Sequence, residues 1–153
     1  MTTAIYSLSI SARLTLDMHS LNNEGGEGNQ IQTRMVDIVA ADGRLHSVNA
    51  ISGDMLKHIQ AEHLYHIAQG NGSLPLCSAC RLFDANRISA DDEYISQIQG
   101  KSDSDAIDLM LQRCALDDIE GNLITEGRST PRKSVAEFGW MVGVPVDEDG
   151  REL

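Results

Sequence analysis

Aromatic residues and long apolar runs are both scarce in this sequence. Phe, Trp and Tyr make up 4% of the 153 residues, while apolar residues make up 41%, as in ordinary globular proteins. No stretch approaches the ~20 apolar residues of a membrane span. The start, MTTAIYSLSISARLTL, lacks the basic region and continuous apolar run of a signal peptide. With an odd number of cysteines, three, these absences predict a cytoplasmic protein without a membrane partner.

Positive charge is also in deficit, because the net charge is −11. Phosphate contacts need Lys and Arg, so this total argues at first sight against nucleic-acid binding. The acids are unevenly spread, however: residues 84–120 hold ten acids against three bases, and residues 147–153 hold four against one. The rest of the chain is then almost neutral. The bulk charge therefore neither supports nor excludes RNA as a partner.

The first fifty residues predict strands. Residues 5–16 alternate strictly between apolar and small polar side chains, which indicates a half-buried strand. The glycine- and asparagine-rich segment 19–30 predicts a flexible loop. Residues 31–39 and 45–50 predict a hairpin, because the turn Ala41-Asp42-Gly43-Arg44 between them contains Asp-Gly.

A helix is predicted from about Asp54 to Gln69, with a cap in Ser52-Gly53-Asp54 and Gly70 as its stop. Its apolar stripe includes His63, which we interpret as a core histidine; the stripe comprises Leu56, Ile59, His63, Leu64 and Ile67. Strand, loop, hairpin and helix in this order predict an α+β fold with helices on one face of a sheet.

The second half of the chain is more polar. Residues 71–80 break the pattern, and the acidic stretch 84–120 predicts polar turns with one short helix at about 104–113, an insertion rather than core. Its acidic cluster could bind a metal, but a solvated or helix-capping role is favoured; the cluster comprises Asp117, Asp118 and Glu120. Residues 134–144 predict a strand whose core includes Phe138 and Trp140.

Three cysteines form the clearest chemical motif. Cys77 and Cys80 have the CxxC spacing that lets two thiolates bind one Zn²⁺, and Cys114 could supply a third ligand. A fourth ligand could come from His63, His66 or an acid. The competing interpretation is three reduced, partly buried cysteines. Redox chemistry would require a thioredoxin-like βαβ setting, which the pattern does not indicate.

A phosphate-holding edge is a second possibility. The glycine-rich segment exposes backbone N–H groups, and the helix starting near Asp54 has a partly positive N-terminus with Lys57 in its first turn. The competing interpretation is a mobile loop and a solvated helical turn. The sequence contains no Walker or GxGxxG pattern, no HExxH pair and no evident Ser/His/Asp constellation.

Three segments, taken in order, resemble a known family. They are SISARLTLDMHSLNNEGGEGNQ from Ser9, NAISGDMLKH from Asn49, and CALDDIEGNL followed by RKSVAEFGWMVG, which ends at Gly143. This set resembles the DevR-type CRISPR-associated autoregulator family, whose members form the repeated backbone of type I Cascade complexes. The resemblance implies an RRM-like (ferredoxin-like) palm with a polar finger-like insertion. The palm would be partial, since family members continue beyond this point, and the aromatic RNP signature of ordinary RRMs is absent from residues 5–16.

The resemblance also implies which residues face RNA. They are Ser11, Arg13, Asn22, Asn23, Ser52, Lys57 and His58, with Arg132 and Lys133 as further phosphate contacts. Such contacts position RNA without reading its sequence. The implied division is a palm at residues 1–70 and 131–146, an insertion at 71–130 that zinc would clip, and a charged tail at 147–153.

The predicted function is that of a non-catalytic subunit that binds guide RNA in a complex for defence against viral and mobile DNA. Its partners would be the guide RNA, target DNA through the guide, further copies of itself and other Cascade subunits. The alternative is a metal-dependent ribonuclease, since related backbone subunits cleave target RNA with a loop aspartate. Here the first loop offers Glu24 and Glu27, with Asp17 as its nearest aspartate. A transcriptional regulator is disfavoured because no helix-turn-helix is evident.

Overall fold

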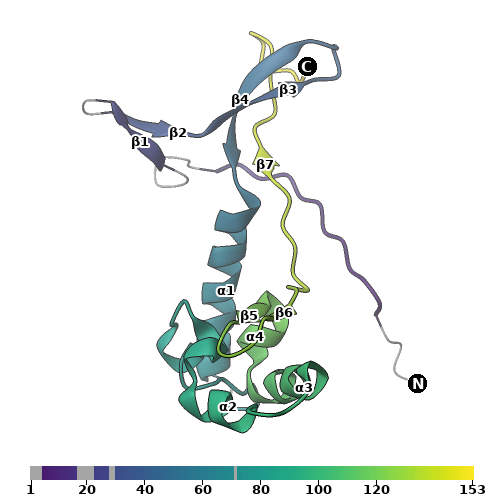
Figure 1. The fold of residues 1–153 in the computed structure, drawn as a ribbon. Helices are drawn as coiled ribbons and strands as arrows, with labels where there is room; N and C mark the ends of the chain where they lie inside the picture. Colours follow the sequence, from purple (N-terminus) through teal and green to yellow (C-terminus); the bar gives the residue numbers. More distant parts are fainter. Residues whose placement is uncertain (1–4, 17–22, 28–29, 71) are drawn as a thin grey trace. The chain divides into compact units, whose positions relative to one another are not determined.

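The computed structural model shows an α+β fold built from short antiparallel sheets and helices (Figure 1). We describe residues 5–16, 23–27, 30–70 and 72–153. The chain divides into two compact units, Met1–Ala50 with Val144–Leu153, here the strand unit, and Ile51–Gly143, here the helical unit. The predicted α+β class is confirmed. The boundaries of palm and insertion stay a prediction, because compactness alone identifies neither part.

The strand unit contains two antiparallel hairpins. In the first, β1 (Asn23–Glu27) pairs with β2 (Gln30–Thr33), and in the second, β3 (Met35–Val39) pairs with β4 (Leu45–Ile51). The second hairpin was predicted, although its first strand, expected at 31–39, is divided between β2 and β3. Gly43 adopts a left-handed φ of 77°, and Arg44 N donates to Asp42 Oδ1 at 2.9 Å. This local turn chemistry is the reason that the hairpin could be read from the sequence.

Two predictions for the strand unit are wrong. None of residues 5–16 lies in a strand, and the apolar side chains at its start, including Tyr6 and Ile10, are exposed. Alternation separates two faces, but a strand also needs a partner for its N–H and C=O groups. The segment 19–30, predicted as a loop, contains the strand β1. The remainder of that segment lies partly outside the described residues.

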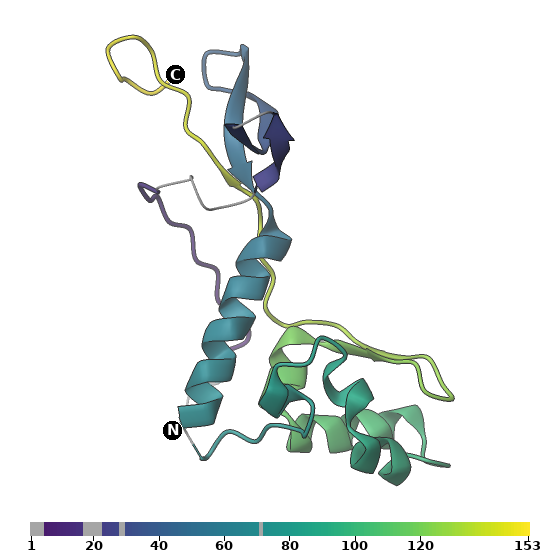
Figure 2. The same cartoon turned by 90° about the vertical axis from the view of Figure 1, so that its left-hand side faces the viewer.

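The helical unit is organised around one long helix, α1 (Gly53–Gly70), which was predicted at 54–69. In both views the short helices gather beside its C-terminal half (Figures 1 and 2). The other elements are η2 (Cys80–Leu82), η3 (Arg87–Ala90), α2 (Asp92–Gln97), α3 (Asp103–Arg113), α4 (Ala115–Glu120), β5 (Asn122–Ile124), β6 (Thr130–Arg132) and β7 (Met141–Val142). The α1 helix packs against α4 and η2, and β5 pairs antiparallel with β6.

The acidic stretch 84–120 holds much of the hydrophobic core, so the expectation that it lies outside the core is wrong, while its status as an insertion stays a prediction. Tyr94 is fully buried, and its hydroxyl donates to Ala106 O at 2.9 Å. On α3, Ala106 and Met110 are four residues apart and face inward, while the acids face outward. The mean polarity of the stretch does not reveal this pattern, in which buried side chains recur with the period of a helix. Other members of the core are Leu76, Cys77, Cys80, Ile88, Ile98, Cys114, Leu116 and Ile124.

The buried face of α1 differs from the predicted stripe. Ala61 and Ala68 are buried and Leu64 and Tyr65 pack against the core, whereas His63 is exposed. The interpretation of His63 as a core histidine is therefore wrong. A stripe of small side chains carries little hydrophobic signal, and larger residues such as Ile67 then dominate a helical wheel although they face outward.

The strand predicted at 134–144 is also largely wrong. Only β7 is a strand there, and Phe138 and Trp140 are 40% and 52% exposed. The start of this segment bonds to the end of α4 and not to a neighbouring strand. Val135 N donates to Ile119 O at 3.0 Å, and the Ser134 hydroxyl donates to the same oxygen at 3.0 Å. The end of α4 thus holds this segment in place of a neighbouring strand.

No helix among the described residues combines the length and the apolar character needed to cross a membrane.

Two glycines in the segments that carry the family resemblance allow a close approach of backbones. A Cβ on Gly53 would lie 2.2 Å from the carbonyl oxygen of Phe138, so only glycine fits at the start of α1. Gly121 combines a φ of 72° and a ψ of 167° with the same constraint, since a Cβ would lie 2.4 Å from Arg132 O. Few residues other than glycine tolerate that backbone conformation.

We therefore expect Gly121→Ala to lower the free energy of unfolding by more than about 3 kcal/mol, from backbone strain and a clash with rigid backbone. Gly127→Ala is the matched control: its φ is also positive, 66°, but no atom lies within 4 Å of the added Cβ. We expect it to cost about 1–2 kcal/mol. Urea unfolding followed by circular dichroism measures both, and equal losses would contradict the close approach.

Candidate metal centre and RNA-facing residues

Three sulfur atoms and one carboxylate converge inside the helical unit. The Sγ atoms of Cys77, Cys80 and Cys114 and a carboxylate oxygen of Asp117 all lie within 4.8 Å of one another, and all four residues are buried. We call these residues the cysteine–aspartate cluster. The three cysteines are free thiols rather than a disulfide pair. The structure thus brings together the three cysteines that the sequence singled out.

Local backbone geometry produces this convergence. The tight turn of η2 lets Cys80 N donate to Cys77 Sγ at 3.3 Å, which places both sulfurs on one side of the turn. Cys114 caps the start of α4, and Ala115 N donates to Pro75 O at 2.9 Å. That hydrogen bond ties the start of α4 to the segment preceding the CxxC motif.

Asp117 is the member that the sequence did not single out, because an unspecified acid was considered as a fourth ligand but Asp117 itself was expected to be solvated or helix-capping. Its Oδ2 lies 3.3 Å from Cys80 Sγ and 3.7 Å from Cys77 Sγ. Its Oδ1 accepts from Ile88 N at 3.3 Å and from Asn122 Nδ2 at 2.8 Å. A signal was available: Asp117 follows Cys114 by three residues, the spacing of a helix N-cap and the third helical residue, whose side chains approach each other.

The cluster perturbs the acidity of its members. Burial raises the pKa of Asp117 to about 7, and the nearby charge of Cys114 adds to the effect. Hydrogen bonds from Cys114 and Cys80 lower the pKa of Cys77 to about 4. Its hydrogen bonds with Cys114 and Cys77 raise the pKa of Cys80 above its usual range. The cluster therefore favours a negative charge on Cys77 and disfavours one on Cys80.

This donor set could bind a metal ion such as zinc, because soft thiolates and a carboxylate at this separation are ligands that Zn²⁺ accepts. His63 and His66, the histidines considered as fourth ligands, are both exposed on α1. The other two members of the predicted acidic cluster behave differently from each other. Asp118 is half-exposed, whereas Glu120 is buried with both carboxylate oxygens lacking a hydrogen-bond partner among the described residues.

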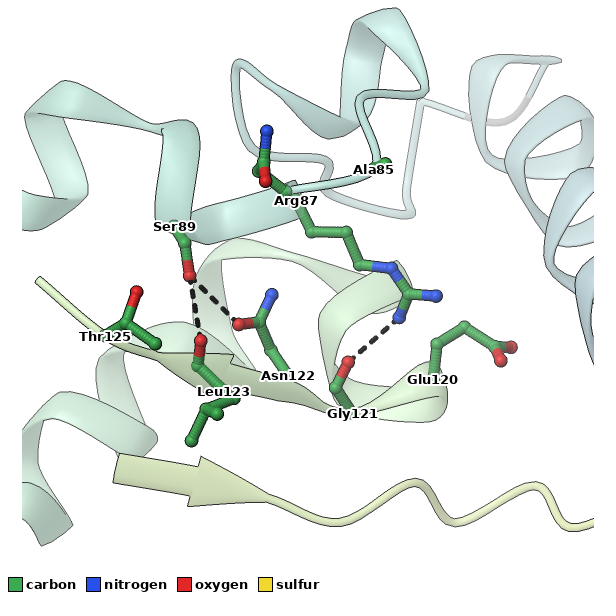
Figure 3. Close-up of a pocket in the computed structure, with 9 residues that line it drawn as sticks. Ala85, Arg87, Ser89, Glu120, Gly121, Asn122, Leu123 and Thr125 are labelled. Atoms are coloured by element: carbon green, nitrogen blue, oxygen red, sulfur yellow. Dashed lines mark hydrogen bonds between the residues drawn. The ribbon is translucent and has the colours of Figure 1, made fainter. Parts of the chain in front are cut away.

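A second layer of hydrogen bonds supports Asp117. Asn122 lines a polar pocket, and its Oδ1 accepts from Ser89 Oγ at 3.1 Å (Figure 3). The same hydroxyl lies 3.2 Å from Leu123 O. With its oxygen engaged by Ser89, the amide of Asn122 presents its Nδ2 to Asp117. In the same view Arg87 Nη1 donates to Gly121 O at 2.9 Å, which joins η3 to the turn before β5.

A second buried carboxylate, Asp91, holds the CxxC turn from another direction. It accepts from Ser78 N and Tyr94 N, each at 3.0 Å, and from Arg113 Nε at 3.0 Å. Burial alone would raise the pKa of Asp91, but the Arg113 guanidinium and the two backbone N–H groups outweigh it and lower the pKa to about 2. Unlike Asp117, Asp91 has a cationic partner of its own.

The RNA-facing residues implied by the family resemblance fall in both units. In the strand unit Ser11 and Arg13 are exposed, and Arg13 forms an ion pair with Glu152. Asn23 begins β1, and Asn22 lies outside the described residues. Nothing in the structure tests whether these positions touch RNA, so their role stays a prediction.

In the helical unit, Ser52 Oγ accepts from Met55 N at 3.3 Å and caps α1 as expected. Further along α1, His58 is exposed, with its ring centroid 5.9 Å from that of Phe83. Lys133 Nζ lies 2.5 Å from Glu137 Oε1. Arg132 Nη2 donates to Asp118 Oδ1 at 2.9 Å.

Lys57 lies near the same carboxylate as Lys133. The pKa of Glu137 is lowered first by its hydrogen bond with Lys133 and its charge, and further by the charge of Lys57. The structure thus pairs Lys133 with an exposed carboxylate on which the charge of Lys57 also acts, although the two lysines are 76 residues apart in the sequence.

Comparison with known proteins identifies one family. A family model described as CRISPR-associated negative auto-regulator DevR/Csa2 matches residues 10–151. The matched range includes the cysteine–aspartate cluster and all nine RNA-facing positions named above. A search of curated proteins found no match.

For the buried pair of Asp91 and Arg113, we expect Asp91→Asn to lower the free energy of unfolding by about 2–3 kcal/mol, because Arg113 loses its buried partner and keeps only Glu93. The pKa of Asp91 is lowered by folding, so its contribution is complete above pH ~4 and is lost as the pH falls toward 2. The variant should therefore lose less stability than the wild type over that range. Asp92→Asn, at the neighbouring exposed acid, is the control. Identical acid titrations of stability for wild type and Asp91→Asn would refute this assignment.

Proposed function

We propose that this chain, which belongs to the DevR/Csa2 family of CRISPR-associated proteins, is a non-catalytic backbone subunit that binds guide RNA in a type I Cascade complex. It would work in the cytoplasm beside further copies of itself and other Cascade subunits, and present the guide to target DNA of viruses and mobile elements. The family match over residues 10–151 is the observation that carries this proposal. An RRM-like palm remains part of the proposal.

The lysines around Glu137 support a phosphate-binding role. The Lys133–Glu137 ion pair is between exposed side chains, at 84% and 66%, and such pairs contribute about 0–1 kcal/mol. A phosphate oxygen could therefore replace the Glu137 carboxylate at little cost. Lys57 then adds a second positive charge within the reach of the same phosphate backbone.

The start of α1 adds backbone donors to these charges. The helix has 18 residues, and its first N–H groups point out of the N-terminus, with the Ser52 hydroxyl engaged by Met55 N. Arg132 is a weaker candidate for the same role, because its Nη2 is already held by the Asp118 carboxylate and its side chain is only 27% exposed. Contacts of this kind bind a backbone without reading its bases.

We further propose that the metal of the cysteine–aspartate cluster is zinc, with Cys77, Cys80 and Cys114 as thiolate ligands. Support comes from the burial of all three sulfurs and from the Cys80 N–H that stabilises a thiolate at Cys77. The lowered pKa of Cys77 agrees with this. The ion would fasten η2 to the junction of α3 and α4, which stabilises the unit that carries Lys57.

Replacement of Lys57 tests the RNA-binding role. We expect Lys57→Ala to weaken binding of single-stranded RNA several-fold at 100 mM salt, because one phosphate contact is lost. The slope of log K against log salt should become shallower by about 0.7–1. Fluorescence anisotropy with two unrelated RNA sequences measures both quantities. Lys101→Ala, at an exposed lysine beside α3, is the control and should change neither.

If Lys57→Ala leaves the slope unchanged, Lys57 makes no phosphate contact. If the wild-type chain binds RNA without any dependence on salt, the proposed backbone recognition is wrong.

The ribonuclease alternative predicts cleavage. Glu24 and Glu27 lie in β1, and Asp17 lies outside the described residues. We expect no cleavage when guide-loaded assemblies are incubated with matched target RNA and Mg²⁺, followed by denaturing electrophoresis. Cleavage at regular intervals that a single change such as Glu24→Gln abolishes would favour the ribonuclease instead.

A further inference from the structure

The cysteine–aspartate cluster contains four groups that can each carry a negative charge, buried together in the hydrophobic core. Cys80, Cys114 and Asp117 are fully buried, and Cys77 is 2% exposed. The partners of Asp117 are the Ile88 N–H, the Asn122 amide and the cysteine sulfurs, and none of these groups carries a positive charge. A buried carboxylate without a cation costs several kcal/mol, so this arrangement favours a positive ion at its centre.

Two of the separations within the cluster match those of a tetrahedral zinc site. With Zn–S near 2.3 Å and Zn–O near 2.0 Å, an ideal tetrahedron places the sulfur and oxygen ligands about 3.5 Å apart. Asp117 Oδ2 lies 3.3 Å from Cys80 Sγ and 3.7 Å from Cys77 Sγ. The two oxygens of Asp117 also have separate partners: Oδ1 accepts two N–H donors, and Oδ2 faces the sulfurs. The carboxylate is thus already oriented with one oxygen directed at the centre.

We propose that Asp117 Oδ2 is the fourth ligand, so that Cys77, Cys80, Cys114 and Asp117 form a closed, structural Zn²⁺ site. This inference rests on the proposal that zinc occupies the cluster. Four protein ligands leave no position for water, which distinguishes a structural site from a catalytic one.

Asn122 and Ser89 are positioning residues in this site. Ser89 Oγ donates to Asn122 Oδ1 (Figure 3). Asn122 Nδ2 in turn donates to Asp117 Oδ1 at 2.8 Å, so the pair fixes the rotation of the carboxylate. Outer-shell partners of this kind orient ligands and change metal affinity by roughly 10–100-fold. Because Ser89 belongs to η3 and Asn122 to β5, the site would join these elements to α4 as well.

The first test is X-ray absorption at the zinc edge of the full chain, purified under reducing conditions, together with its metal content. We expect about one zinc per chain with three sulfur neighbours near 2.3 Å and one oxygen near 2.0 Å. A first shell of four sulfurs would overturn the proposed fourth ligand. The same measurement on Asp117→Cys, which offers a fourth thiolate at this position, should show four sulfurs.

The second test compares variants by competition for Zn²⁺ with a chelator and by the visible absorption of bound Co²⁺. We expect Asp117→Asn to weaken Zn²⁺ binding by more than about 100-fold, beyond the range for outer-shell partners, and to change the Co²⁺ spectrum. Asn122→Ala should weaken binding by roughly 10–100-fold with the Co²⁺ spectrum unchanged. Asp108→Asn, at an exposed acid of α3, is the control and should match the wild type.

The outcomes separate the two proposals. A wild-type chain that binds neither Zn²⁺ nor Co²⁺ after reduction refutes zinc itself, and the cluster is then three thiols and a carboxyl group. Zinc binding with wild-type affinity and spectrum in Asp117→Asn refutes only the role of Asp117. If Asp117→Asn does not fold, the absorption data on the wild type decide the question. RNA binding by the wild type is measured separately and depends on neither result.

Discussion

The buried carboxylate of Asp117 is the interaction on which the helical unit most depends. Removing a carboxylate from water costs several kcal/mol unless hydrogen bonds or a cation compensate it. Its two N–H donors come from η3 and β5, and its sulfur neighbours come from η2 and the α3–α4 junction. The groups that compensate Asp117 therefore come from several segments around α4, although α1 contributes none. Compensating the charge of Asp117 thus fixes how α4, η2, η3 and β5 are arranged.

Asp91 and Asp117 solve the same electrostatic problem in different ways. Both are fully buried, and both hold the CxxC turn, Asp91 through Ser78 N and Asp117 through the cysteine sulfurs. Asp91 has the Arg113 guanidinium beside it, and its pKa falls to about 2. Asp117 has no cationic partner among the described residues, and its pKa rises to about 7. The difference between the two sites is one positive charge, and a metal ion is the species that would supply it at Asp117.

Local signals made part of this structure predictable from the sequence. Asp42-Gly43 identified the β3–β4 hairpin, Ser52 and Gly70 bracketed α1, and the CxxC spacing with Cys114 identified three members of the cluster. Asp117 was not singled out among the acids because its acidic neighbours suggested a solvated patch, although its spacing from Cys114 is that of an N-cap and the third residue of a helix. The strands predicted at 5–16 and 134–144 failed for another reason. Alternation specifies faces, whereas the partner that satisfies the backbone is a non-local property that no single segment contains.

The metal centre lies on the same unit as Lys57 and His58, two of the proposed RNA contacts, and α1 connects them. The C-terminal half of this helix packs on the core through Leu64, Tyr65 and Ala68, and its first two turns carry Lys57 and His58. Eighteen residues of α-helix span about 27 Å, and an α-helix transmits position along its axis with little bending. The position of Lys57 therefore depends on how firmly the C-terminal half of α1 is packed. A closed metal site at that end would stabilise the packing without taking part in any contact with RNA, which is the role expected of a structural ion in a binding protein.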